Sequence, residues 1–253
     1  MSKILVLLTS LILISSVNCT SNKEKVKIFI AWPGVSYLPG YNWEKGESKP
    51  TGVEPALIEK ILDEAGYDYI YIPDYRITKD GDVRINALTE GAADIAIRSI
   101  TISEERKDKV NFSKPYYYDG VSALTLKNSN IETEQDLMGK TVYSYDFHTA
   151  FNWANENLPE SKIVSYNDYS YEHEPEELLL EGKIDAYLGD RTFLMILSKD
   201  NAKFRVLDNT FTSEPFGIAV RKDKPQLLKD INSAIEKLKK SGELEKITSG
   251  FQK

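Results

Sequence analysis

The chain has 253 residues, of which 41% are hydrophobic, and carries a net charge of -7 at pH 7 with a pI near 5.1. A chain of this size and composition can bury one or two cores, which excludes the disordered and fibrous classes. The acidic balance argues against a nucleic-acid partner, because neutralising phosphates requires a basic face.

The first 18 residues differ in character from the rest. An apolar run over 4–14 is too short to span a bilayer and is followed by small and polar residues. This pattern predicts a secretory signal peptide over 1–18 and an exported protein. Cys19 is the only cysteine, and S-V-N-C (16–19) resembles a bacterial lipobox. We expect a lipid anchor at Cys19, at the periplasmic membrane or outer cell surface, and a linker over 19–25; an idle cysteine is the alternative.

The region that follows alternates between strand and helix patterns. Strands are predicted over 26–31, 67–73 and 93–97, with a helix in GVEPALIEKILDEAG (52–66) and another over 82–90. The first helix places its apolar residues on one stripe and stops at its final glycine. Strand, helix, strand, helix, strand predicts a parallel sheet with helices on its faces.

The second half of the chain repeats this alternation. Its predicted strands are 141–145, 162–166, 184–189 and 203–207, and its predicted helices are 148–157, 174–181 and 191–198. Two extended runs, 117–127 and 214–222, would cross between two α/β lobes. We therefore expect lobe one over 26–119, lobe two over 120–213, and a return to lobe one over 214–253. The last segment would be a helix packed on lobe one.

Five segments resemble one protein family, and they occur in the family's order. They are ALTEGAADIAIRSITISEERKDKVNFSKPYY (87–117), GVEPALIEKILDEAG, LMGKTVYSY (137–145), LLLEGKIDAYLGD (178–190) and GIAVRKDKPQLLKDINSAIEKLKKSGELEKI (217–247). They look like the family 3 extracellular solute-binding proteins, the polar amino-acid receptors of ABC importers. The resemblance implies a type II periplasmic-binding-protein-like fold, in which two lobes are joined by a two-strand hinge with the ligand between them.

The resemblance also implies how the ligand is held. Arg106 would clamp the ligand carboxylate, Thr101 would add a hydroxyl and an amide, and Ser99 would accept from the ammonium through its carbonyl. Asp190 falls where the family places the carboxylate that takes the ammonium. Other roles remain open: Arg106 could form a surface ion pair with a neighbouring acid, and Asp190 could cap the helix that follows it.

Two positions depart from the family pattern. Phe147, His148 and Thr149 stand where the family usually has a glycine followed by two hydroxyl residues. Thr149 is expected to remain a donor to the ligand, whereas His148 could face either the ligand or solvent. Arg98 is a further pocket candidate. If Arg98 and His148 both point inward, a ligand with a second acidic or polar group is favoured.

The loop that follows the first strand supplies aromatic residues where the family stacks the ligand side chain. Trp32, Tyr37 and Tyr41 are candidates for this contact, and a core or rim position is an equal alternative for each. With 15 tyrosines in the chain, no single tyrosine is a strong indication.

Enzymatic functions have little support in the motifs. There is no G-x-S-x-G elbow, and His148 and His173 lack metal-ligand spacing, so we expect neither a cofactor nor a metal. The enzyme alternative is a cyclohexadienyl dehydratase, which resembles these receptors. A sensory partner of a membrane receptor is a third possibility. We expect a monomer that binds a free amino acid and delivers it to an ABC permease.

Overall fold

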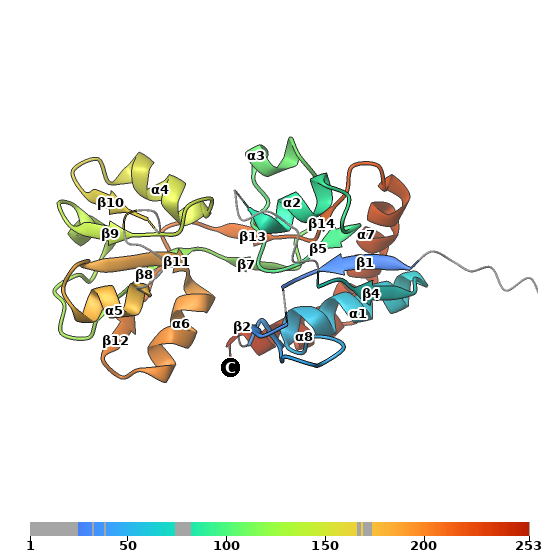
Figure 1. The fold of residues 1–253 in the computed structure, drawn as a ribbon, viewed down its shortest axis with the longest axis horizontal. Helices are drawn as coiled ribbons and strands as arrows, with labels where there is room; N and C mark the ends of the chain where they lie inside the picture. The colour runs from blue at the N-terminus through green and yellow to red at the C-terminus, as the bar shows by residue number, and fades with distance from the viewer. Residues whose placement is uncertain are drawn as a thin grey trace, which may run out of the picture.

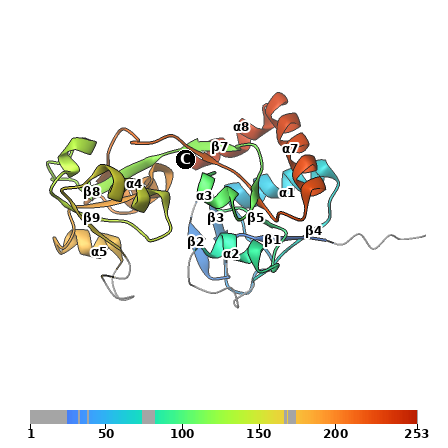
Figure 2. The same cartoon turned by 90° about the horizontal axis from the view of Figure 1, so that it is seen from above.

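A computed structural model describes residues 25–31, 33–37, 39–73, 82–165, 168 and 174–252. The chain forms two lobes side by side, with two extended segments running between them (Figure 1). The lobes remain separate masses when seen from above (Figure 2). The predicted signal peptide, Cys19, Trp32 and His173 lie outside the described residues.

Lobe one is built on a five-stranded sheet with the strand order β4-β1-β5-β14-β6. The strands are β1 (Val26–Phe29), β4 (Tyr69–Tyr71), β5 (Ile95–Ala96), β6 (Asn111–Phe112) and β14 (Ala219–Val220). β1 runs parallel to β4 and β5, whereas β14 is antiparallel to β5 and β6. The three strands predicted for the first part of lobe one are confirmed. Because parallel neighbours need crossover connections, helices lie on the faces of this sheet.

The helices of lobe one divide between the two faces of its sheet. They are α1 (Val53–Ala65), α2 (Val83–Thr89), α3 (Glu104–Lys107), α7 (Pro225–Lys240) and α8 (Glu243–Thr248), followed by a 3₁₀ turn (Ser249–Gln252). Ile28 packs in one core cluster with α1 and α7, while Phe29 packs with α2 on the other face. This alternation is the period of a strand buried on both sides. Gly66 ends α1 with a φ of 76°, a left-handed conformation that favours glycine.

Lobe two repeats the arrangement with a sheet of order β10-β9-β11-β8-β12. Its strands are β8 (Val121–Leu126), β9 (Thr141–Tyr143), β10 (Lys162–Val164), β11 (Ala186–Asp190) and β12 (Phe204–Val206). Its helices are α4 (Thr149–Asn157), α5 (Pro175–Leu180) and α6 (Arg191–Asp200), with a 3₁₀ turn at Glu134–Leu137. One core cluster lies under α4, and a second lies under α5 and α6 on the opposite face. The predicted second α/β lobe is confirmed.

The hinge is a pair of antiparallel strands, β7 (Tyr117–Asp119) and β13 (Glu214–Phe216). Each predicted extended run is divided in the structure, because its first part pairs in the hinge and its second part enters a sheet. Gly120 marks the division between β7 and β8. A Cβ atom on Gly120 would lie 2.2 Å from the carbonyl oxygen of Thr212, so only glycine allows the two crossing segments to approach this closely. A short pair, β2 (Val35–Tyr37) and β3 (Tyr41–Trp43), lies beside lobe one.

Candidate functional site

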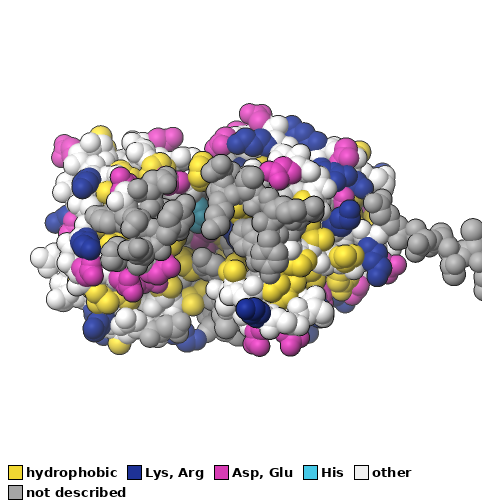
Figure 3. All heavy atoms as spheres, viewed as in Figure 1, with side chains coloured by type: hydrophobic (Ala, Val, Ile, Leu, Met, Phe, Trp, Pro, Cys, Tyr) yellow, Lys and Arg dark blue, Asp and Glu magenta, His cyan; other side chains and the backbone are white. Residues whose placement is uncertain are grey.

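A cavity of about 260 Å³ lies between the two lobes, with walls from both lobes and from the hinge strand β7. Its charged lining residues are Glu54, Arg84, Arg98, Asp119, Asp146 and Asp190. Its aromatic lining residues are Tyr41, Tyr145, Tyr187, Phe193 and Phe251. In the space-filling view a histidine side chain is visible where the two masses meet (Figure 3). A concave space with aromatic walls and a few converging charges is typical of a small-molecule site.

The lobe-one wall is formed where β5 ends. Ser99 has a φ of 45°, a conformation that costs energy for any residue other than glycine. Two cavity-lining side chains hold it there. The Ser99 amide donates to Oε1 of Glu54 at 2.5 Å, and Nη1 of Arg84 donates to the Ser99 carbonyl at 3.4 Å. Such strained residues are concentrated at ligand sites, where the surrounding contacts fix them.

Arg106, the predicted carboxylate clamp, is 7% exposed and does not line the cavity. Its Nη1 donates to the Thr101 carbonyl at 3.0 Å, and its Nη2 donates to the Phe147 carbonyl at 3.2 Å and lies 3.0 Å from Oδ2 of Asp82. The guanidinium is therefore engaged within the protein. A ligand carboxylate would have to exchange with Asp82 to reach it, and the clamp role stays a prediction.

Asp82 compensates two buried guanidiniums at once. Besides Arg106, it receives two hydrogen bonds from Arg84, each of 2.7 Å. Burial alone would raise the pKa of Asp82, but the charge and hydrogen bonds of Arg84, together with the charge of Arg106, hold that pKa well below its usual range. Arg98 differs from both guanidiniums. It lines the cavity, and within the described part of the chain its side chain has no hydrogen-bond or ion-pair partner.

The two threonines predicted as ligand donors meet on a third residue. Oγ1 of Thr101, from lobe one, donates to Oε2 of Glu214 at 2.7 Å, and Oγ1 of Thr149, from lobe two, donates to the same oxygen at 2.6 Å. Glu214 lies on the hinge strand β13 and is 7% exposed. The structure therefore brings these two hydroxyls together, on a carboxylate of the protein that links the lobes.

Two carboxylates line the cavity at the hinge and in lobe two, those of Asp119 on β7 and Asp190 on β11. Asp190 ends β11 and directly precedes α6, but its side chain makes no hydrogen bond that caps this helix. Asp119 instead accepts from the Thr192 amide at 3.0 Å. Burial, followed by the nearby charges of Asp119 and Glu214, raises the pKa of Asp190 well above its ordinary value. A cation beside Asp190 would oppose this shift and favour the ionised carboxylate, as expected for an ammonium partner.

His148 lines the cavity immediately before α4, so its side chain lies on the inward side. The residue is exposed, yet confinement between the lobes, and then the positive charge of Arg84, lower the pKa of His148 to about 3. His148 is therefore neutral at pH 7. Phe147 has a φ of 63°, a left-handed conformation that favours glycine, the residue expected here from the family resemblance. Its bulky side chain is 59% exposed and therefore turns outward.

The predicted aromatic contacts have different outcomes. Tyr41 lines the cavity and is 1% exposed, so it belongs both to the core of lobe one and to the wall of the cavity. The backbone of Tyr37 forms the end of β2. Trp32 lies outside the described residues. The contacts of these residues with a ligand stay predictions.

Several residues of the site were absent from the sequence-based set, among them Glu54, Arg84, Asp119 and Glu214. Glu54 gave a weak signal, because an acid in the first turn and on the apolar stripe of a helix needs a partner when it is buried. Asp119 and Glu214 each lie in an extended segment predicted to cross between lobes, but their opposition depends on the register of the hinge. Arg84 gave no signal that distinguishes it from a surface arginine.

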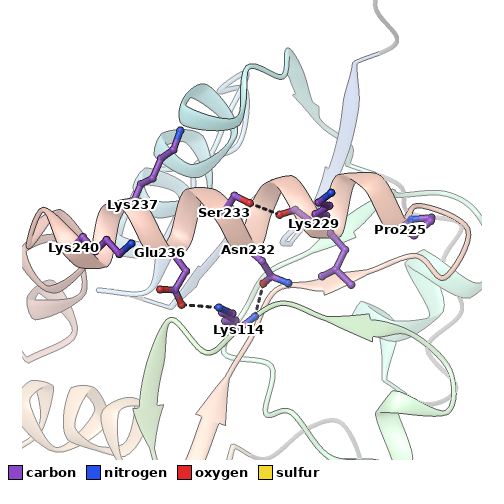
Figure 4. A pocket seen from close by; sticks show the side chains of 9 residues that line it. Lys114, Pro225, Lys229, Asn232, Ser233, Glu236, Lys237 and Lys240 are labelled. Atoms are coloured by element: carbon purple, nitrogen blue, oxygen red, sulfur yellow. Dashed lines mark hydrogen bonds and ion pairs between the residues drawn. The ribbon is translucent and has the colours of Figure 1, made fainter.

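A larger hollow of about 570 Å³ lies on the outer side of α7, but it is open and shallow. Figure 4 shows Lys114 reaching the helix there, with its Nζ 2.8 Å from Oε1 of Glu236 and its amide donating to Asn232 at 2.7 Å. The lysines of this groove are solvated or paired on the surface. The interlobe cavity is the stronger candidate because its charged groups are buried or half-buried and converge.

Among the described residues, no group of three or more His, Cys, Asp or Glu side chains could hold a metal ion. The helices within the same ranges are also too short or too polar to cross a membrane.

Comparisons with known proteins agree with this architecture. The glutamine-binding protein GlnH of a Bacillus subtilis ABC transporter is 33% identical over 165 residues, which span 65% of this chain and 59% of that protein. The L-cystine-binding protein TcyJ of Escherichia coli is 30% identical over 230 residues, 89% of this chain and 82% of that protein. An ancestral arginine-binding protein solved with glutamine superposes with a TM-score of 0.73 at 29% identity, covering 90% of this chain and 97% of that one.

The match to a family model is also extensive. Residues 34–252 fit the family described as bacterial extracellular solute-binding proteins, family 3. This range includes both lobes and both hinge strands. The two-lobed fold predicted from the sequence is thus confirmed, and the chain belongs to family 3 of the bacterial extracellular solute-binding proteins.

Proposed function

We propose that this protein captures a free amino acid in the interlobe cavity and delivers it to an ABC importer. The observation that carries the proposal is the distribution of charge across the cavity. Arg98 presents a guanidinium from lobe one, and Asp190 presents a carboxylate from lobe two. A zwitterion has one group for each, and closure of the lobes over it would strengthen both interactions as water leaves.

The carboxylate end has two candidate clamps. Arg98 is available in the cavity, whereas Arg106 would become available only if Asp82 released it. Thr101 and Thr149 would add hydroxyl donors by turning from Glu214 to the ligand. At the other end, Asp190 would take the ammonium, with Asp119 beside it. The names of the relatives, which bind glutamine or cystine, support an amino-acid ligand.

A thermal-shift screen of the mature protein against the twenty amino acids and cystine tests the proposal. A bound ligand raises the melting temperature as its concentration rises above Kd. Asp190→Asn should weaken binding of every responding ligand by about 10-fold or more, because it removes a charge-assisted contact. Asp208→Asn, at an exposed position of lobe two, is the matched control and should bind normally. A screen without any response, or full affinity in Asp190→Asn, would refute the proposal.

We infer that the protein is a carrier and not an enzyme. One structural neighbour, an ancestral amino acid-binding protein described as a precursor of cyclohexadienyl dehydratase, is 28% identical with a TM-score of 0.72. An Asp190 paired with an ammonium is an anchor and a poor proton donor. Incubation with prephenate or arogenate should therefore yield no aromatic product, and a product would contradict the inference.

We also propose that Cys19 is acylated and holds a monomer at the membrane. Cys19→Ser should release the protein from the membrane fraction, and mass spectrometry of the wild-type protein should find the lipid on the N-terminal peptide. A wild-type protein found free in the soluble fraction would refute the anchor. Light scattering would test the monomeric state.

A further inference from the structure

A basic stretch begins where β14 ends and continues to the end of α7. Residues 221–240 hold seven Lys or Arg against three Asp or Glu, a net charge of +4 in a chain whose net charge is -7. One side of α7 is apolar and is buried in lobe one through Leu227, Ile231 and Ile235. Its lysines are all exposed on the other side, so α7 presents a positive face on an acidic protein.

The shallow groove on the outer side of α7 gathers much of this charge (Figure 4). Four of its described lining residues are lysines, and one, Glu236, is an acid. Lys114 lies 2.8 Å from Glu236, and Lys237 pairs with an acid of α1 at 3.0 Å. Lys229 and Lys240, about three turns apart, have no acidic partner in the described part of the chain. Their charges are therefore available to a partner.

The described chain starts beside the beginning of α7. The Lys27 amide donates to Oδ2 of Asp94 at 3.0 Å, and Oδ1 of the same carboxylate lies 3.4 Å from Nζ of Lys224, the residue directly before α7. Cys19 comes six residues before Lys25, so their Cα atoms are at most about 22 Å apart. With a lipid on Cys19, residues 19–25 would be a short tether that keeps this end of lobe one close to the bilayer.

The positive face and the tether would act together. α7 has 16 residues and is about 24 Å long, which is comparable to the reach of the tether. Attraction between lysines and anionic headgroups is screened within about 10 Å at moderate salt, so it requires a surface that is already held near the lipid. The rest of the chain carries net negative charge and would be repelled, so the same field would turn α7 towards the membrane.

We propose that the outer face of α7 contacts the anionic lipid headgroups of the membrane that holds the protein. The inference rests on the acylation of Cys19 proposed above, which supplies the proximity. The described lining of the groove contains no aromatic side chain, so it lacks the anchors typical of a specific protein interface. Among the described residues, none lines both the groove and the interlobe cavity, so this contact would leave the ligand site accessible.

Coupling through Cys19, the only cysteine, reproduces the tether in vitro. The mature chain is attached to a maleimide lipid in vesicles of phosphatidylcholine, with or without phosphatidylglycerol, and lysine acetylation is followed by mass spectrometry. Lys237 and Lys240 should react about 5-fold or more slowly on the anionic vesicles, the factor for one basic residue near such a surface. Lys127 and Lys203, exposed on lobe two, should react equally on both. Equal rates for the α7 lysines on both vesicles would overturn the inference and favour an acidic protein partner.

A pair of double variants with the same net charge locates the effect. Lys229→Gln with Lys240→Gln should reduce the difference at Lys237 between the two kinds of vesicle to about 2-fold or less. Lys127→Gln with Lys203→Gln removes the same charge from lobe two and should keep the full difference. The same difference in both double variants would refute the role of α7. Because the coupling replaces the acyl chain, these results do not depend on acylation in the cell, whose absence would instead refute the proposed anchor.

Discussion

Replacing Asp82 with asparagine should destabilise the protein strongly, because Asp82 is the shared counter-charge of Arg84 and Arg106. Its oxygens receive two hydrogen bonds of 2.7 Å from Arg84 and lie 3.0 Å from Nη2 of Arg106. Both arginines are 7% exposed. Asp82→Asn leaves both positive charges buried without their carboxylate.

The expected loss is large relative to the stability of a typical domain. Removing one partner of a buried ion pair costs about 3–5 kcal/mol. The whole free energy of unfolding of a domain is about 5–15 kcal/mol. For a chain of this size, the melting temperature should fall by roughly 6–20 °C.

The chain contains a matched control for this substitution. Arg221 and Asp223 have the same sequence spacing and a similar two-bond geometry, with donor–acceptor distances of 2.6 and 3.1 Å, but the Asp223 side chain is 65% exposed. Asp223→Asn should leave the urea midpoint close to that of the wild type, because solvent screens an exposed pair. Urea denaturation followed by tryptophan fluorescence measures both variants. Equal losses in the two variants would refute the claim that burial sets the strength of the Asp82 cluster.

The pH dependence of this effect has a defined sign. The folded pKa of Asp82 lies well below its unfolded value of about 3.9, so the carboxylate contributes stability above about pH 4 and loses it as pH falls through the folded pKa. The stability gap between wild type and Asp82→Asn should therefore be constant from about pH 8 to pH 5 and should narrow only below about pH 4. A gap that closes near neutral pH would contradict the assigned shift.

Three further substitutions probe the hinge and the contact between the lobes. Thr149→Val removes the hydroxyl that donates to Glu214 at 2.6 Å and should lower the free energy of unfolding by about 1.5–3 kcal/mol; an unchanged urea midpoint would show that this bridge is absent in solution. Gly120→Ala places a Cβ atom 2.2 Å from the Thr212 carbonyl and should cost about 1–3 kcal/mol in the same assay, whereas wild-type stability would mean that the crossing segments can separate freely. Phe147→Gly relieves a φ of 63° at a 59% exposed side chain and should raise stability by up to about 1 kcal/mol in calorimetry; a loss would indicate that the phenyl ring packs usefully.

Local patterns predicted the secondary structure well because their signals act over a few residues. The end of α1 at Gly66 occurs where the sequence places it. In the structure, α3 begins directly after Ser103. Ser103 accepts a hydrogen bond from the Arg106 amide, as expected of a helix cap. The division of residues 117–127 at Gly120 was not predictable, because it depends on contact with Thr212, a residue far along the chain.

The site was predictable only in part, for a related physical reason. Asp190 was expected at the site from the family resemblance and Arg98 as a further pocket candidate. Both line the cavity, at or shortly after the ends of sheet strands. The partners of Arg106 and Thr101 could not be read from the sequence. Asp82 precedes a different helix, and Glu214 lies 113 residues beyond Thr101. Such pairings are fixed by tertiary register, which no local periodicity encodes.

The register of the hinge allows lobe two to be separated from lobe one at a single pair of residues. Asp119 and Glu214 stand directly opposite each other on β7 and β13. The apolar clusters of lobe two draw only on residues between them, whereas those of lobe one use none of that segment. A two-residue turn joining Asp119 to Glu214 would close a hairpin and leave the remaining lobe with its cores complete. Replacing the segment between Asp119 and Glu214 with the second lobe of a relative would exchange one wall of the cavity and leave the other wall unchanged.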